Sequence, residues 1–249
     1  MDYPSDEDFW GRMAIEKAGY AAIGLVCKRN CWFPSADIEW TLSILNPLLR
    51  PYKNIVLYGF SMGGYGAVKF SRHLAASCVI SLSPQYSIDP NDVFPHDRRL
   101  IKHFNPAVNI NMSIKSHDMS GRIFLFYDPK VQEDSWNVER ILENADENAK
   151  IIPVRAPNIG HETIDLFAGS SFIEQLVSLC LSGDLTQLRE FTSLQRRRSQ
   201  RRIFHILSKA KTRFPQSAEI LYEQNRELLL PYWQKKWDEP LEAEGSNFG

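Results

Sequence analysis

A serine, a histidine and several aspartates are the residues of this chain whose types and order could support nucleophilic catalysis. Ser61 stands in the segment Gly59-Phe60-Ser61-Met62-Gly63, and His161 follows Gly160 far downstream. A serine hydroxyl is a poor nucleophile at neutral pH unless a base takes its proton and a third group orients that base. His161 could be this base, and an aspartate between the two could be the orienting acid.

The residues around Ser61 predict a sharp turn between a strand and a helix. An apolar run from Asn54 ends in Gly-x-Ser-x-Gly, and small residues then open a helical pattern. Such a turn, the nucleophile elbow, holds the serine hydroxyl out at the end of a sheet. It also aims the backbone N–H of Met62 at the place where an oxyanion would form, beside the positive end of the helix dipole. We expect glycine at 59 and 63 because a bulky side chain at either position would collide with a neighbouring element.

Through Gly59-Phe60-Ser61-Met62-Gly63-Gly64, and through the strand and helix pattern from about residue 20 to 180, the chain resembles the α/β-hydrolase superfamily. The resemblance implies a serine, an acid and a histidine in that chain order. It places the general base just past a late strand, where His161 stands. The implied activity is that of a serine hydrolase, which cleaves an ester, thioester or similar acyl bond through an acyl-enzyme.

Three aspartates are candidates for the acid. Asp128 and Asp134 both follow the strand that carries the acid in this superfamily. Asp128 comes directly at the strand end and is early for a contact with His161, whereas Asp134 could instead be the N-cap of the next helix. We favour Asp134, keep Asp128 as the second candidate, and keep an acid such as Asp89, from the loop after the preceding strand, as the third.

The elements that must position these residues alternate along the chain. Apolar runs predict buried strands at 20–27, before the elbow, and at 78–82, 122–127 and 151–154, with helical patterns between them. This alternation predicts the α/β class, with a doubly wound, mostly parallel sheet. Ligand sites in such sheets collect at the carboxyl ends of strands. The loop after 20–27 should therefore border the site, with Asn30 and Trp32 as candidate substrate-binding residues.

One feature departs from the family pattern. The resemblance implies a strand before the first helix, which pairs beside the elbow strand and whose exit loop donates a second oxyanion N–H. The residues before Ser5 cannot supply it. We expect either that 20–27 pairs directly with the elbow strand or that the chain starts late relative to its relatives and lacks the N-terminal strands. In the second case the alternative is a catalytically impaired module that serves in binding or assembly.

The chain is expected to divide into a hydrolase-like domain at 1–183 and a C-terminal helical appendage at 184–249. Residues 85–120 contain several prolines and little periodic hydrophobicity, which indicates an insertion of short helices that forms a lid or substrate wall. The C-terminal helices resemble a tetratricopeptide-type hairpin. A single hairpin cannot bury its apolar face alone, so we expect docking on the hydrolase body or a homodimer through these helices.

Composition narrows the class of partners. The 249 residues carry a net charge of -1, which gives no global attraction to nucleic acid or to an anionic membrane. We see no signal peptide and no apolar segment long enough to span a bilayer, so a cytoplasmic location is expected. The four cysteines and the histidines have no ordinary ligand spacing. We therefore expect a small-molecule or acylated substrate, and neither a metal nor a cofactor.

Overall fold

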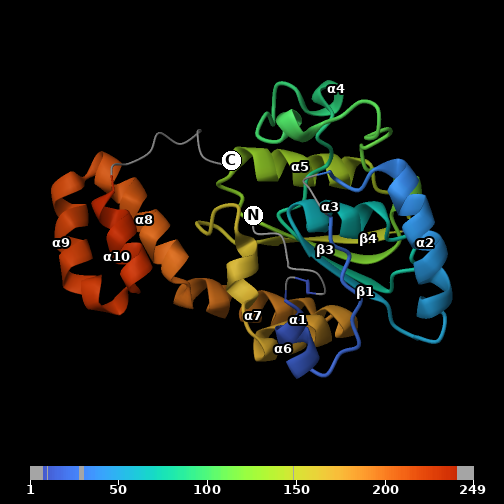
Figure 1. The fold of residues 1–249 in the computed structure, drawn as a ribbon. Coiled ribbons are helices and arrows are strands. Elements are labelled where there is room, and N and C mark those ends of the chain that lie inside the picture. Colours follow the sequence, from blue (N-terminus) through green and yellow to red (C-terminus); the bar gives the residue numbers. More distant parts are fainter. Residues whose placement is uncertain (1–7, 10, 28–30, 148, 240–249) are drawn as a thin grey trace.

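A four-stranded parallel sheet in the order β1-β2-β3-β4 forms the centre of the computed structural model, which describes residues 8–9, 11–27, 31–147 and 149–239 (Figure 1). Each strand is hydrogen-bonded to the next in the chain. Parallel neighbours require a crossover on one face of the sheet, and helices form these crossovers. The predicted α/β class with a parallel sheet is confirmed. The strands are β1 (Val56–Phe60), β2 (Cys78–Leu82), β3 (Gly121–Tyr127) and β4 (Ala149–Arg155).

Helices lie on both sides of the sheet. Figure 1 shows α3 and α5 on one face, and α1, α6 and α7 on the other. The helices, in chain order, are α1 (Arg12–Lys17), α2 (Ser35–Leu49), α3 (Met62–Lys69), α4 (Pro90–Val93), α5 (Gln132–Glu143), α6 (Ser170–Ser182), α7 (Leu185–Arg198), α8 (Gln200–Arg213), α9 (Pro215–Asn225) and α10 (Pro231–Asp238). Short 3-10 turns are η1 (Ile101–His103), η2 (Ser116–Asp118), η3 (Thr163–Phe167) and η4 (Arg226–Leu228).

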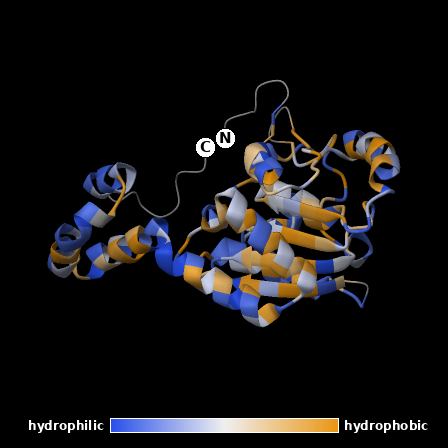
Figure 2. Cartoon of the chain, turned by 90° about the horizontal axis from the view of Figure 1, so that it is seen from below, coloured by the Kyte–Doolittle hydropathy of each residue, from blue (hydrophilic) through white to orange (hydrophobic). Residues whose placement is uncertain are grey.

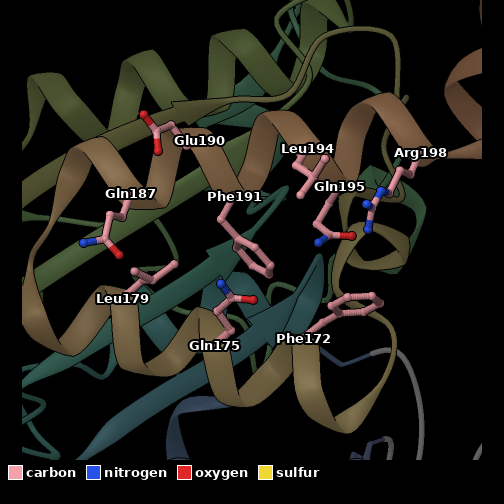
Figure 3. Close-up of a pocket in the computed structure, with 9 residues that line it drawn as sticks. All are labelled: Phe172, Gln175, Leu179, Gln187, Glu190, Phe191, Leu194, Gln195 and Arg198. Atoms are coloured by element: carbon pink, nitrogen blue, oxygen red, sulfur yellow. The ribbon is translucent and has the colours of Figure 1, made fainter.

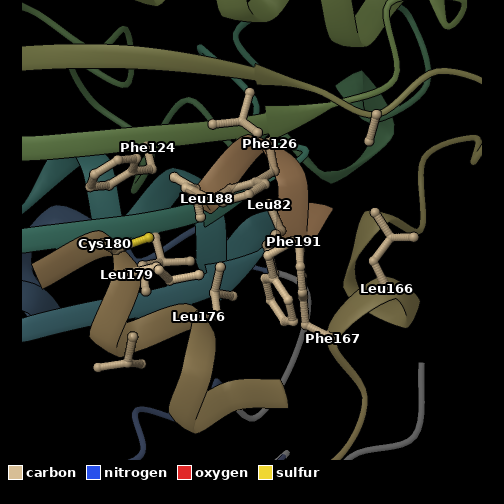
Figure 4. Packing of buried hydrophobic residues seen from close by; sticks show 14 of the residues in the cluster. Leu82, Phe124, Phe126, Leu166, Phe167, Leu176, Leu179, Cys180, Leu188 and Phe191 are labelled. Atoms are coloured by element: carbon tan, nitrogen blue, oxygen red, sulfur yellow. The ribbon is translucent and has the colours of Figure 1, made fainter. Parts of the chain in front are cut away.

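The alternation of side chains along the central strands explains why both faces are apolar. On β3, Ile123 and Leu125 join the cluster under α3 and α5, whereas Phe124 and Phe126 join the cluster on the opposite face. Successive side chains of a strand point to opposite faces, so a strand covered on both sides must be apolar throughout. Figure 4 shows the second cluster, in which Phe167 packs against Phe126 and against Phe191 of α7, with ring centroids 5.3 and 5.8 Å apart. Figure 2 shows the same concentration of apolar residues along the strands.

The predicted strand at 20–27 is not formed. Residues 20–27 have no regular secondary structure, and Ile23, Leu25 and Val26 are exposed. In the described part of the chain, β1 is therefore an edge strand of the sheet. An apolar run forms a strand only where a neighbouring strand can pair with its backbone, and hydrophobicity alone does not reveal whether that neighbour exists. The direct pairing of 20–27 with the elbow strand was thus a wrong prediction.

Residues 85–120 contain α4, η1 and η2, so the expected short helices are present. The segment is tied to the elbow helix α3 by buried polar contacts. Tyr65 donates from its hydroxyl to the carbonyl of Met112 at 2.9 Å, and Lys69 forms an ion pair of 2.8 Å with Asp118. These bonds hold the segment against the helix that starts at the candidate nucleophile.

The C-terminal helices pack in two places. α7 packs with the sheet, because Leu188 and Phe191 belong to the same cluster as Phe126. Helices α8 to α10 surround a small core of their own, which contains Leu207, Ala218, Tyr222, Leu229 and Trp237. Three large apolar side chains of α8 and α9 are exposed, namely Ile206, Ile220 and Leu221. No described helix is both long and apolar enough to cross a membrane.

Candidate active site

Ser61 lies at the turn between β1 and α3, in a backbone conformation that few residues other than glycine adopt. Its φ is 52° and its ψ is -116°, and its backbone N–H donates to the carbonyl of Leu82 at 2.8 Å. Strained conformations of this kind persist only where the surroundings enforce them, and they cluster at functional sites. Because α3 begins at Met62, the N–H of Met62 has no acceptor within the helix and lies at the positive end of the helix dipole.

Of the two positions in the elbow that were predicted to require glycine, only one does. A Cβ at Gly59 would overlap the carbonyl group of Gly63, so glycine is required there. A Cβ at Gly63 would meet nothing within 4 Å, which contradicts the expected collision at that position. The second tight approach is at Gly64, where a Cβ would come within 2.9 Å of Ser81 Oγ on β2. The helix therefore packs against the sheet through Gly64, one residue later than the motif suggested.

Gly59→Ala is expected to destabilise the protein by several kcal/mol, because the added methyl group meets backbone atoms that cannot move away without breaking the elbow. Gly63→Ala is the matched control. It adds the same group in open space inside a helix, where alanine is favoured over glycine by about 0.5–1 kcal/mol. Chemical denaturation of the two variants measures the difference. Equal stability of the two variants would contradict the steric role of Gly59.

His161 lies between Ser61 and Asp134. Its Nε2 is 3.1 Å from Ser61 Oγ, and its Nδ1 is 2.9 Å from Asp134 Oδ2 and 3.0 Å from Asp134 Oδ1. An ionised carboxylate only accepts hydrogen bonds, so this arrangement suits the tautomer in which Nδ1 donates to Asp134 and Nε2 accepts from the serine hydroxyl. The ring also packs at 5.2 Å from the ring of Phe60. The structure thus brings together the three side chains that the sequence nominated first.

The two other candidate acids have different neighbours. Asp128 accepts from the backbone N–H groups of Lys130, Ile159 and Gly160 at 2.8, 2.7 and 2.8 Å, so it holds the loop that carries His161. Asp89 is the N-cap of α4 and accepts from the N–H of Asn91. Asp134 itself lies in the first turn of α5 rather than at its N-cap, which is Val131. Its carboxylate is therefore available to His161.

A second anchor of the His161 loop comes from the residue that follows β2. Ser83 donates from Oγ to the carbonyl of His161 at 2.6 Å and lies 3.0 Å from Thr163 Oγ1. Together with Asp128, this serine fixes the loop to the carboxyl ends of two strands. These bonds fix the backbone around His161. The imidazole ring takes no part in them and contacts Ser61 and Asp134.

Three polar residues near the site were not singled out by the sequence. Gln85 is fully buried and donates from Nε2 to Ser61 Oγ at 3.3 Å. Arg99 donates to Asp134 at 2.9 Å, and Asp97 forms an ion pair with Arg99 at 2.8 Å. The position of Gln85, three residues after the end of β2, was a usable signal, because side chains at the carboxyl ends of neighbouring strands converge. No comparable signal marks Arg99 or Asp97, which lie in an irregular segment.

The structure describes only one of the two predicted substrate-binding residues. Asn30 lies outside the described residues. Trp32 is buried, with 2% of its surface exposed, and packs in the cluster with Tyr65 and Val68 of α3. Its indole stacks on the ring of His103 at 5.5 Å between centroids. In this structure Trp32 supports the elbow helix from within the core.

A groove of about 340 Å³ lies between α6 and α7, away from Ser61, and Figure 3 shows Phe172, Phe191 and Leu194 among the side chains that line it. None of Ser61, Asp134 and His161 lines this groove. In the described part of the chain, no group of His, Cys, Asp or Glu side chains is arranged to hold a metal ion. Comparisons of the chain with models of protein families, with curated proteins and with solved structures found no match.

Proposed function

We propose that this chain is a serine hydrolase that cleaves an ester, thioester or similar acyl bond, with Ser61 as nucleophile, His161 as general base and Asp134 as the orienting acid. The observation that carries the proposal is the continuous hydrogen-bond chain from Asp134 through His161 to Ser61, within 3.1 Å at each step. The strained backbone of Ser61 supports it independently, because nothing in an ordinary surface turn would require that conformation.

The proposed reaction has two halves. Ser61 Oγ attacks the acyl carbon while His161 Nε2 takes the hydroxyl proton, and Asp134 stabilises the imidazolium that forms. The N–H of Met62 holds the oxyanion of the tetrahedral intermediate. His161 then donates its proton to the leaving alcohol or thiol, which departs and leaves an acyl-enzyme. Water, deprotonated by His161, attacks the acyl carbon, and Ser61 regains the proton as the acid is released.

Gln85 adds a hydrogen-bond donor on the nucleophile itself. Its Nε2 reaches both Ser61 Oγ and the carbonyl of Ser83, the latter at 3.4 Å. Because the carbonyl can only accept, the amide nitrogen faces these two oxygens. A donor at Oγ stabilises the negative charge that develops on this oxygen as its proton leaves. Gln85 therefore supports the same role for Ser61.

The finer account of the fold is part of this proposal. Ser61, Asp134 and His161 follow β1, β3 and β4, so serine, acid and histidine come in the chain order of the α/β-hydrolase superfamily. We place residues 1–183 in a hydrolase-like domain, with 85–120 as a wall of the site, and residues 184–249 in a helical appendage whose first helix, α7, packs on that domain. The contacts of Arg201 on α8 with Glu162 and Asp165 at 3.0 and 2.7 Å connect this appendage to the segment after His161.

A fluorophosphonate probe tests the activated serine without knowledge of the substrate. We expect the native protein to gain one covalent adduct, located at Ser61 by mass spectrometry of its peptides, and the heat-unfolded protein to gain none. The reason is that phosphonylation needs both the general base and the oxyanion site in their folded arrangement. A native protein that remains unlabelled would contradict the proposal and favour a binding or assembly module.

A further inference from the structure

The carboxylate of Asp134 has a second charged partner besides His161. Arg99 donates from Nη2 to Asp134 Oδ1 at 2.9 Å, and the same oxygen lies 3.0 Å from His161 Nδ1. The Arg99 side chain is 17% exposed and that of Asp134 is 1% exposed. Solvent therefore screens these charges only weakly, and a cation at this place acts on the imidazole through a shared oxygen.

Arg99 is held in turn by Asp97. The guanidinium donates from Nε to Asp97 Oδ1 at 2.9 Å and from Nη2 to Asp97 Oδ2 at 2.8 Å, a bidentate arrangement that fixes its orientation. Asn137, one turn after Asp134 on α5, donates to Asp97 Oδ2 at 2.8 Å. The pair is thus clamped to the helix that carries Asp134.

Charge is retained by both members of this pair. Burial opposes the charge of Arg99, but its hydrogen bonds and Coulombic interactions with Asp97 and Asp134 outweigh this and raise the pKa of the guanidinium. Burial likewise opposes the charge of Asp97, yet the bonds from Arg99 and Asn137 lower the pKa of that carboxyl below its usual value. A fixed cation and a fixed anion therefore stand next to Asp134 at neutral pH.

We propose, building on the proposed function, that Arg99 and Asp97 are positioning residues for Asp134, with Arg99 fixing the carboxylate and reducing the negative charge that His161 experiences, and Asp97 limiting that reduction. Both residues belong to the segment 85–120, which is also anchored to the elbow helix. The orientation and the charge of His161 therefore depend on the folded arrangement of the segment 85–120. The segment acts on the histidine through the acid.

The two members of the pair have opposite effects on the imidazole. Loss of Arg99 removes a cation near the imidazolium, which favours the protonated form and moves its titration to higher pH. Loss of Asp97 removes an anion and leaves Arg99 uncompensated, which moves the titration to lower pH. The remaining charged or titratable groups on the elements packed around His161 are unchanged by either substitution, namely Asp128, Glu162, Asp165, Arg196, Arg201 and His205.

The test is a direct NMR titration of the His161 imidazole through its long-range nitrogen–proton correlations, assigned with His161→Gln. We expect the midpoint in Arg99→Gln to lie about 0.5–1 pH unit above that of the unsubstituted protein, and that of Asp97→Asn to lie below it. Arg99→Lys keeps the cation but not the bidentate fork, so its midpoint should stay within a few tenths of a unit. Arg98→Gln is the matched control, because Arg98 is exposed over the ring of Phe94.

This measurement needs no turnover, so its result is separate from the outcome of the fluorophosphonate experiment. Folding of each variant is checked by circular dichroism before titration. Opposite displacements of the midpoint in the two variants would support the proposal. Unchanged midpoints in folded Arg99→Gln and Asp97→Asn, or displacements of the same sign, would overturn it and leave the pair as an ordinary buried ion pair. If Arg99→Gln does not fold, Arg99→Met and Asp97→Asn decide by the same criterion.

Discussion

Ser61→Ala and His161→Ala are each expected to lower kcat for a p-nitrophenyl ester by up to the order of 10⁶-fold, because each removes a member of a unit that works only as a whole. The double variant Ser61→Ala with His161→Ala should be no slower than either single variant. Residual activity above that of water would come from the proposed oxyanion site at Met62 and from substrate binding. Steady-state kinetics at saturating ester measures all three variants.

Neither substitution should unfold the protein, since Ser61 is small and His161 is held mainly through its backbone carbonyl by Ser83. Thermal unfolding curves provide this control. An additive loss in the double variant would show that the two residues act separately. Full activity of Ser61→Ala would remove it as the nucleophile.

Asp134→Asn is expected to reduce kcat by about 10⁴-fold while the fold is retained. An amide at this position donates as well as accepts, so it can hold the imidazole in the wrong tautomer and cannot stabilise the imidazolium. Asp134 lies in the first turn of α5 and is not the N-cap, so the helix start should survive. The measurement is the kcat of the variant with the same ester.

Asp128→Asn is the matched comparison, because it also replaces a carboxylate with an amide, in the loop between β3 and α5. Asp128 accepts three backbone N–H groups, and its amide would place a donor against at least one of them. Leaving a buried N–H without an acceptor costs about 1–3 kcal/mol, so this variant should lose stability more than Asp134→Asn does. Its kcat should fall much less. A reversed order of the two kcat values would assign the orienting role to Asp128.

Features of the candidate site that depend on neighbouring residues could be predicted from the sequence. Gly-x-Ser-x-Gly after an apolar run predicted a strand, a sharp turn at the serine and a helix in succession, and β1, Ser61 and α3 form that succession. These features depend on residues adjacent in sequence, so turn geometry and the need for close approach at Gly59 suffice to define them. The strand at 78–82 was equally clear, because a short run buried on both faces is apolar throughout.

Other features of the fold and the site depend on contacts with residues distant in the sequence, which no local pattern predicts. The apolar run at 20–27 has the composition of a strand, but no neighbouring strand pairs with it, so it is left as irregular chain. Which aspartate meets His161 was open because Asp128 and Asp134 follow the same strand. The choice between the two aspartates depends on the distance from the first turn of α5, which carries Asp134, to the His161 loop about thirty residues later. Only the folded chain defines that distance.

The sequence by itself determined the turn from strand to helix at Ser61 and the α/β class, since these follow from local propensity and periodicity, whereas the expected order of serine, acid and histidine came from the family resemblance. The tertiary structure decided that Gly64 rather than Gly63 makes the close approach, that Asp128 holds the His161 loop, and that Arg99 and Asp97 surround Asp134. Those contacts join segments that are distant in the chain. Their geometry is set by packing of the whole fold, which no window of neighbouring residues encodes.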